Sequence, residues 1–218
     1  REMIQFDKTN QMKQFPQDLG RSAKQTMEAD CYNVLTTSGN YTRNSTTNDN
    51  DVGANTAATT FSSTGLLTAL RTLRTMKDRK SGRYFGIQPN LLLVTPGLEF
   101  AAKQLLMSAE VSRAHGNTSA ETYGTGTANP FRGVVSKIIV SPWVGTTYEW
   151  VLMEPKMAVI LQQVEPLQLL VESVTGVSNE AYFLYDVIRY RVSNWYGVGF
   201  LNDRYAYLST ATAAPAVA

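Results

Sequence analysis

The sequence predicts an α+β protein, with helices mainly in its first half and strands mainly in its second half. Two observations carry this prediction. Apolar residues recur three and four positions apart in residues 15–35, 66–73 and 98–109, which is the period of an amphipathic helix. From residue 134 onward, short β-branched and aliphatic runs alternate with proline and glycine, which is typical of strands and turns. A chain of 218 residues is long enough to bury most of its apolar surface.

Residues 15–35 are predicted to form one long helix. Its apolar stripe steps by four or three positions along the chain. The stripe consists of Phe15, Leu19, Ala23, Met27, Cys31 and Val34. Residues 36–64 differ in composition, because threonine, serine, asparagine, aspartate and glycine dominate there. We therefore expect a long loop between this helix and the next.

Residues 66–106 are predicted to form the unit around which the rest of the fold is organised. The first helix of this unit carries an apolar stripe made of Leu66, Leu70 and Leu73. Ser62, Ser63 and Thr64 precede it, and their hydroxyls can accept hydrogen bonds from the first-turn amides. Gly82 is expected to end the helix in a left-handed turn.

A buried strand is predicted at residues 91–94, because this apolar run is too short for a helix and is bounded by turn residues. Thr95 and Pro96 are predicted to begin a second helix, with the hydroxyl as the cap and proline at the first position. Glu99 lies in its first turn, where the helix dipole favours an anion. The expected core-facing stripe is Leu98, Ala101, Ala102, Leu105 and Ala109.

The second half of the chain is predicted to be rich in strands. The expected strands are residues 134–140, 148–153, 157–161, 167–171 and 182–196. Pro142, Gly145, Pro155 and Pro166 are expected to separate them, and Gly197 and Gly199 to follow the last one.

Composition restricts the classes of function. Charged residues make up 17% of the chain, below the usual value of about 25%, which indicates a neutral surface suited to subunit contacts. A net charge of +2 does not by itself predict nucleic-acid binding. Cys31 is the single cysteine, so no internal disulfide forms and a reducing compartment is expected. No apolar run reaches the roughly 18 residues that predict a membrane span, and the first residues do not resemble a signal peptide.

The sequence contains no recognisable catalytic or metal-binding pattern. His115 is the single histidine, and neither an HExxH nor a GxSxG motif is present. We therefore predict no enzyme activity, no catalytic residues, no cofactor and no metal. The one charged cluster, which we call the basic cluster, consists of Arg71, Arg74, Lys77, Arg79, Lys80 and Arg83. It is interpreted either as a solvated helix face or as a surface for an acidic neighbouring subunit or a nucleic-acid backbone.

The order of these parts resembles the major capsid proteins of tailed phages with the Hong Kong 97-type fold, in particular the Mu-like major head subunit family. Residues 129–144 resemble the segment that begins a strand in that family, and residues 185–209 resemble its closing strand and aspartate-arginine ending. The matching residues of the central segment are Gly82, Ile87, Pro89, Leu92, Val94, Pro96, Leu98 and Glu99.

The resemblance implies an α+β capsid fold in which a spine helix and a β-sheet form a P-domain beside an α/β A-domain. Residues 1–60 would form the first part of the P-domain, residues 61–160 the A-domain, and residues 161–218 the return to the P-domain sheet and the tail. The polar loop around residues 110–129 would lie at the capsomer axis. Its candidate axis residues are Arg113, His115, Asn117 and Tyr123.

The function implied by the resemblance is self-assembly, through pentamers and hexamers, into an icosahedral shell that encloses double-stranded DNA without sequence specificity. The protein would be located in the virion capsid after assembly in the host cytoplasm, with decoration, scaffold, protease or portal proteins as further partners and no membrane. An encapsulin-type nanocompartment shell, which encloses protein cargo, is one alternative. A secreted β-rich binding module is another, although the missing signal peptide and disulfides weigh against it.

Overall fold

The computed structural model describes residues 11–41, 51–52, 55–78, 81–111, 127–145, 147–171 and 189–215. The chain divides into two compact units, which are described separately below. Unit 1 comprises Arg1–Asp30 and Leu161–Val198, and unit 2 comprises Cys31–Ile160 and Gly199–Ala218. Helices and strands occur together in the described residues, which is compatible with the predicted α+β class.

Unit 2 is built on a five-stranded mixed sheet. Strand β11 pairs in parallel with β2 and antiparallel with β8, and β4 pairs antiparallel with β8 and in parallel with β7. In spatial order the strands are β2 (Thr56–Ala57), β11 (Ala206–Ser209), β8 (Trp150–Met153), β4 (Leu91–Val94) and β7 (Lys137–Val140). The predicted strand at residues 91–94 is therefore confirmed with its bounds, and those at residues 134–140 and 148–153 are confirmed with later starts.

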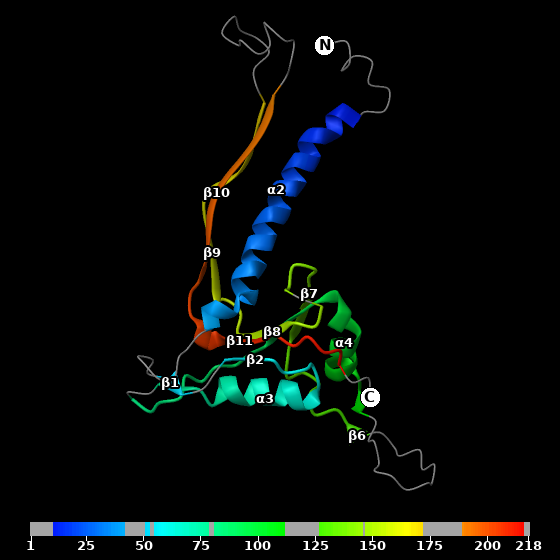
Figure 1. The fold of residues 1–218 in the computed structure, drawn as a ribbon, viewed down its shortest axis with the longest axis vertical. Coiled ribbons are helices and arrows are strands. Elements are labelled where there is room, and N and C mark those ends of the chain that lie inside the picture. Colours follow the sequence, from blue (N-terminus) through cyan, green and yellow to red (C-terminus); the bar gives the residue numbers. More distant parts are fainter. Residues whose placement is uncertain are drawn as a thin grey trace, which may run out of the picture. The chain divides into compact units, whose positions relative to one another are not determined.

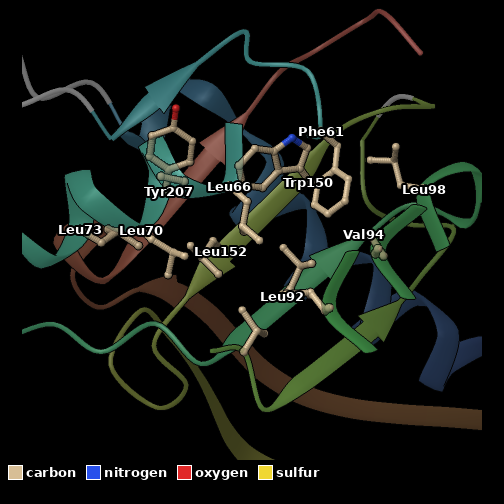
Figure 2. Close-up of a cluster of buried hydrophobic side chains, with 14 of the residues drawn as sticks. Phe61, Leu66, Leu70, Leu73, Leu92, Val94, Leu98, Trp150, Leu152 and Tyr207 are labelled. Carbon is tan, nitrogen blue, oxygen red and sulfur yellow. The ribbon is translucent and has the colours of Figure 1, made fainter. Parts of the chain in front are cut away.

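One face of this sheet packs against two helices, α3 (Ser63–Arg74) and α4 (Glu99–Met107), which Figure 1 shows in unit 2. In Figure 2, Trp150 and Leu152 of β8 lie among the side chains that α3 directs toward the sheet. The fully or nearly fully buried members of this cluster include Phe61, Leu66, Leu70, Leu73, Leu92, Val94, Leu98, Trp150, Leu152 and Tyr207. This cluster is the larger core of unit 2.

The opposite face is covered by the end of the long helix α2 (Gln11–Thr36) and the 3-10 turn η1 (Ser38–Tyr41). The Tyr41 ring packs edge-on against Phe200 with a centroid distance of 5.1 Å, and its hydroxyl donates to the Leu35 carbonyl oxygen at 2.7 Å. Burial, together with the Asp203 carboxylate, raises the pKa of the Tyr41 hydroxyl above its ordinary value, so the group stays a neutral donor. Because both faces of the sheet are covered, every residue of β4 is buried.

Helix α3 begins as predicted and ends earlier than predicted. Its N-cap is Ser62, whose Oγ accepts a hydrogen bond from the Gly65 amide at 3.0 Å. The helix ends at Arg74, and the amide of the C-cap residue Thr75 donates to the Arg71 carbonyl oxygen. The prediction that Gly82 ends this helix is wrong. Gly82 has a φ of 66° in a separate turn, where its amide donates to the Asp78 carbonyl oxygen at 2.8 Å.

Two glycines provide a first test of the packing around the helices. A Cβ atom at Gly65 would lie 2.5 Å from the Thr60 carbonyl oxygen, whereas a Cβ atom at Gly20 of α2 would meet nothing within 4 Å. We expect Gly65→Ala to lower the free energy of unfolding by about 1–3 kcal/mol through overpacking. Gly20→Ala should raise it by about 0.5–1 kcal/mol, because alanine is the better helix former. Urea denaturation of both variants checks the pair, and equal effects would contradict it.

The second predicted helix starts with a 3-10 turn, η2 (Pro96–Leu98), before α4. Thr95 occupies the cap position as predicted, but its Oγ1 donates to the Thr147 carbonyl oxygen at 2.6 Å instead of accepting from a first-turn amide. Glu99 in the first turn of α4 pairs with Lys103. The prediction that Ala109 closes the buried stripe is wrong, because Ala109 is exposed and Leu106 is buried in its place.

Short strands and turns occur within residues 36–64, which were predicted as one long loop. Short strands also lie at the two ends of the predicted polar loop at residues 110–129. Strand β1 (Asp51–Val52) pairs antiparallel with β3 (Lys77–Asp78), and β2 joins the main sheet, so residues 36–64 are a loop only in part. Strand β5 (Glu110–Val111) pairs antiparallel with β6 (Thr127–Ala128). A third 3-10 turn, η3 (Asp203–Tyr205), precedes β11.

Unit 1 contains most of α2 and most of a ribbon of two paired strands, β9 (Val159–Val171) and β10 (Tyr190–Phe200), which Figure 1 shows running side by side. The predicted long helix at residues 15–35 is confirmed within α2. The predicted break at Pro166 is wrong, because β9 continues through it as a single strand. Proline is tolerated in an edge strand when its position faces away from the partner. The prediction that Gly197 and Gly199 follow the last strand is also wrong, because both lie inside β10.

Candidate functional site

The predicted basic cluster lies on and directly after α3. Arg71 and Arg74 are exposed on this helix, and Arg83 is exposed beyond it. Among the described residues, these three guanidinium groups form no ion pair. Arg79 and Lys80 lie outside the described residues. Three cations without a carboxylate partner in the described part of the chain make this surface electropositive.

Backbone pairing after α3 positions Lys77 and Arg83, two described members of the basic cluster. The Asp78 amide donates to the Arg83 carbonyl oxygen at 2.9 Å, and the Ser81 hydroxyl and amide both donate to Asp78 Oδ2. Lys77 is half-buried, and its Nζ lies 4.4 Å from the centroid of the Tyr84 ring. This cation–π contact fixes the ammonium group beside an aromatic ring that is 61% exposed.

Arg74 also lines a shallow, open pocket of about 470 Å³ at the start of β4. The pocket wall includes Ile87 and Pro89, which belong to the central segment of the resemblance, and Val134. The Gln88 amide in the wall donates to the Glu154 carboxylate at 3.1 Å. Among the described residues that line the pocket, none is an aspartate, glutamate, histidine or cysteine.

The four candidate axis residues, Arg113, His115, Asn117 and Tyr123, lie outside the described residues. Asn129, which follows this loop, was not predicted to have a structural role beyond its place in the resemblance. Its buried Nδ2 donates to the Leu105 carbonyl oxygen at 2.7 Å and to the Ser108 carbonyl oxygen at 3.1 Å, and its Oδ1 accepts from the Phe131 amide at 2.9 Å. Asn129 therefore caps the carbonyl end of α4 and fixes the chain that returns from the loop.

The described residues contain no group of three histidine, cysteine, aspartate or glutamate side chains that can hold a metal ion. None of the described helices is sufficiently long and apolar to cross a membrane. The features that remain as functional candidates are therefore surfaces: the basic cluster of unit 2 and the ribbon of unit 1.

The ribbon concentrates exposed apolar side chains. Nine of the eighteen exposed large hydrophobic side chains in the described part of the chain lie on β9 and β10. They are Ile160, Leu161, Val164, Leu167, Leu169, Leu170, Val171, Tyr190 and Trp195. Sequence reasoning missed this surface, because alternating strands predict one buried face, whereas here every residue of β9 after Val159 is exposed. Contiguous exposed apolar surface marks an interaction site.

Hydrogen bonds show which face of the ribbon points toward α2 within unit 1. The Tyr196 hydroxyl donates to Asp30 Oδ2 at 2.5 Å, and the Asn194 amide nitrogen lies 3.7 Å from Met27 Sδ. Across the ribbon, Gln163 Nε2 donates to Asn194 Oδ1 at 3.2 Å, so Gln163 shares this face. The ribbon therefore has one side toward α2, on which strand alternation also places Leu161, Leu167, Leu169 and Val171, and a second side that points away from α2.

Residues 1–209 match a protein family described as phage capsid protein. The match covers both compact units and all the strands and helices described above. No curated protein matches the chain, and no solved structure matches it either.

Proposed function

Because this chain belongs to the phage capsid protein family, we propose that it is the major capsid protein of a tailed phage and has the Hong Kong 97-type fold. In this proposal, copies of the chain assemble through pentamers and hexamers into an icosahedral shell around double-stranded DNA. The role is structural and not enzymatic, and the mature location is the virion, after assembly in the host cytoplasm. Decoration, scaffold, protease and portal proteins are the further partners expected of such a shell.

The observation that best supports assembly is the exposed apolar ribbon of unit 1. A two-stranded ribbon is at best marginally stable alone in water. Side chains such as Trp195, which is 64% exposed, and Val164, which is 59% exposed, add stability when another surface removes them from water. A protein whose role is to pack against many copies of itself accounts for such a surface. Heterologous contacts that close around an axis then give a container instead of an open fibre.

We further propose how the two units correspond to the domains of the capsid fold. Helix α2 serves as the spine helix, and the β9–β10 ribbon belongs to the P-domain sheet. The five-stranded sheet with α3 and α4 forms the core of the A-domain. The loop that carries Arg113, His115, Asn117 and Tyr123 lies at the capsomer axis. This last assignment follows from the resemblance of the sequence to that fold.

Size-exclusion chromatography and negative-stain microscopy of the full-length product test the proposal. We expect closed shells of uniform diameter, or rings of five or six subunits. Nuclease-protected DNA inside the shells supports a virus, whereas an enclosed protein would indicate a nanocompartment. A monodisperse monomer across micromolar concentrations, in the full-length product, would contradict assembly.

The basic cluster gives a more specific prediction. We propose that Arg71 and Arg74 face either an acidic surface of a neighbouring subunit or the packaged DNA. The double charge reversal Arg71→Glu with Arg74→Glu should reduce capsomer association or retained DNA about tenfold at physiological salt, which corresponds to about 1.4 kcal/mol. Sedimentation and the DNA content per shell measure the two effects separately.

The matched control changes two other exposed cations of unit 2, Arg132→Glu with Lys137→Glu, and alters the net charge equally. Neither control residue forms an ion pair with another described residue. If both double variants behave alike, net charge alone explains the effect. Unchanged assembly and DNA retention in the Arg71 and Arg74 variant would remove the proposed role of the cluster.

A further inference from the structure

We propose that the side of the β9–β10 ribbon that points away from α2 is a contact surface for a second copy of this chain. We call this side the outer face and define it by Val164, Leu170, Arg191 and Trp195. The inference rests on the proposed function, because the proposed function identifies the partner as another copy of the chain. It adds the surface of unit 1 through which copies meet and the kind of contact that they form.

The alternation of side chains along a strand assigns these residues to the outer face. Asn194 and Tyr196 direct their side chains toward α2, as their hydrogen bonds show. Successive side chains of a strand point to opposite faces, so Trp195 and Arg191 point away from α2. Gln163 bonds to Asn194 on the helix side, and therefore Val164 and Leu170 also lie on the outer face.

The outer face combines large apolar side chains and one arginine of β10 with the polar side chains of Gln162, Gln168 and Ser193. Trp195 is 64% exposed, Val164 59% and Leu170 47%, in a chain that contains three tryptophans. Tryptophan and arginine are the side chains most enriched among residues that dominate binding energy. Arg191 is the one charged residue in β10, and it forms no ion pair in the described part of the chain. Together with the exposed Arg189 just before the strand, this gives two cations, which fit a protein surface better than a nucleic-acid backbone that requires many cations.

The free edges of β9 and β10 are poorly suited to pairing with strands of another copy. A second copy is therefore expected to bind the face of the ribbon. No described strand pairs with the free edge of β9 or of β10. Pro166 lies within β9 and Arg191 within β10, and proline and charged side chains are the residues that prevent edge-to-edge pairing. Growth of the sheet from copy to copy is therefore disfavoured, and the apolar face remains as the surface to be covered.

Charge complementarity supports a second copy as the partner. Unit 1 itself presents two exposed carboxylates, Glu28 on α2 and Glu165 on β9, that form no ion pair among the described residues. Each can provide the anion that Arg191 lacks when unit 1 of another copy approaches. The contact then combines an apolar centre at Trp195 and Val164 with a polar rim, which is the usual anatomy of a protein interface.

The first test compares two exposed tryptophans. Trp195→Ala should raise the subunit concentration needed for assembly by about thirtyfold, the effect expected of a residue that dominates an interface. Trp143→Ala, which removes a tryptophan that is 46% exposed in unit 2, is the matched control and should leave assembly within about twofold of the unaltered chain. Val164→Lys provides a second outer-face variant with the same expected direction. Circular dichroism and thermal melting show that each variant folds.

The second test follows Trp195 itself in the assembled protein. In a Trp143→Phe chain, the remaining tryptophans are the buried Trp150 and the exposed Trp195, so acrylamide quenching of fluorescence reports on Trp195. We expect quenching in free subunits and protection in shells. Shells in which Trp195 stays fully quenchable, with normal assembly of Trp195→Ala, would overturn the inference and leave the proposed function intact. Failure of the unaltered full-length chain to form any oligomer would overturn both.

Discussion

Replacing Trp150 by alanine is expected to lower the free energy of unfolding by about 3–5 kcal/mol, the range for removing a large buried aromatic side chain. Trp150 is fully buried at the centre of the larger core, where its ring lies 5.6 Å from Phe61 and 5.7 Å from Tyr207 between ring centroids. Its Nε1 donates to the Thr59 carbonyl oxygen at 3.1 Å, a bond that alanine also removes. Urea denaturation followed by far-ultraviolet circular dichroism measures the change.

Two further variants separate the causes of this loss. Trp150→Phe keeps an aromatic ring and removes the indole donor, while the Thr59 carbonyl oxygen still accepts from the Ser209 hydroxyl, so a loss of about 0.5–1.5 kcal/mol is expected for the hydrogen bond. Trp143→Ala removes an exposed ring and should change stability by no more than about 0.5 kcal/mol. If Trp150→Ala is as mild as Trp143→Ala, the described packing of unit 2 is incorrect.

The second large effect is expected at Asn129. Asn129→Ala removes an amide that donates to the carbonyl oxygens of Leu105 and Ser108 and accepts from the Phe131 amide. Because these backbone groups are partly buried, leaving them without partners should lower the free energy of unfolding by about 2–3 kcal/mol. Urea denaturation measures the loss. Limited proteolysis should also show faster cleavage between α4 and β7.

The matched control is Asn40→Ala. Its exposed side chain likewise donates to a carbonyl oxygen near a helix end, that of Val34, at 2.8 Å. Water can replace this bond, so the expected loss is below about 1 kcal/mol. Equal losses in the two variants would show that Asn129 has no special role in fixing the loop after α4.

The parts of the fold that were predicted from sequence are those specified by short-range patterns. The leucine stripe of α3, the serine cap before it and the strand at residues 91–94 depend on neighbours in sequence, and the structure confirms all three. The predictions failed where a distant partner decides. The Thr95 hydroxyl bonds to Thr147 instead of capping its own helix, because that carbonyl oxygen is brought to it by the fold.

The continuity of β9 through Pro166 could not be predicted for a related reason. Proline is excluded from a strand that is paired on both sides, but the sequence does not state how many neighbours a strand has. In a two-stranded ribbon each strand has one free edge, and proline fits there. The same missing information hid the exposed ribbon face, since an apolar run in sequence does not show whether anything covers it.

The basic cluster was found from sequence because it requires only local charge counting.

The position of β11 in the sheet has a consequence for synthesis of the protein. Residues 206–209 lie between β2, which begins at residue 56, and β8, so the strand β2 joins the sheet only after residue 209 has left the ribosome. Contacts between residues so distant in sequence form late and slowly. A nascent chain therefore cannot complete unit 2 before its last strand emerges.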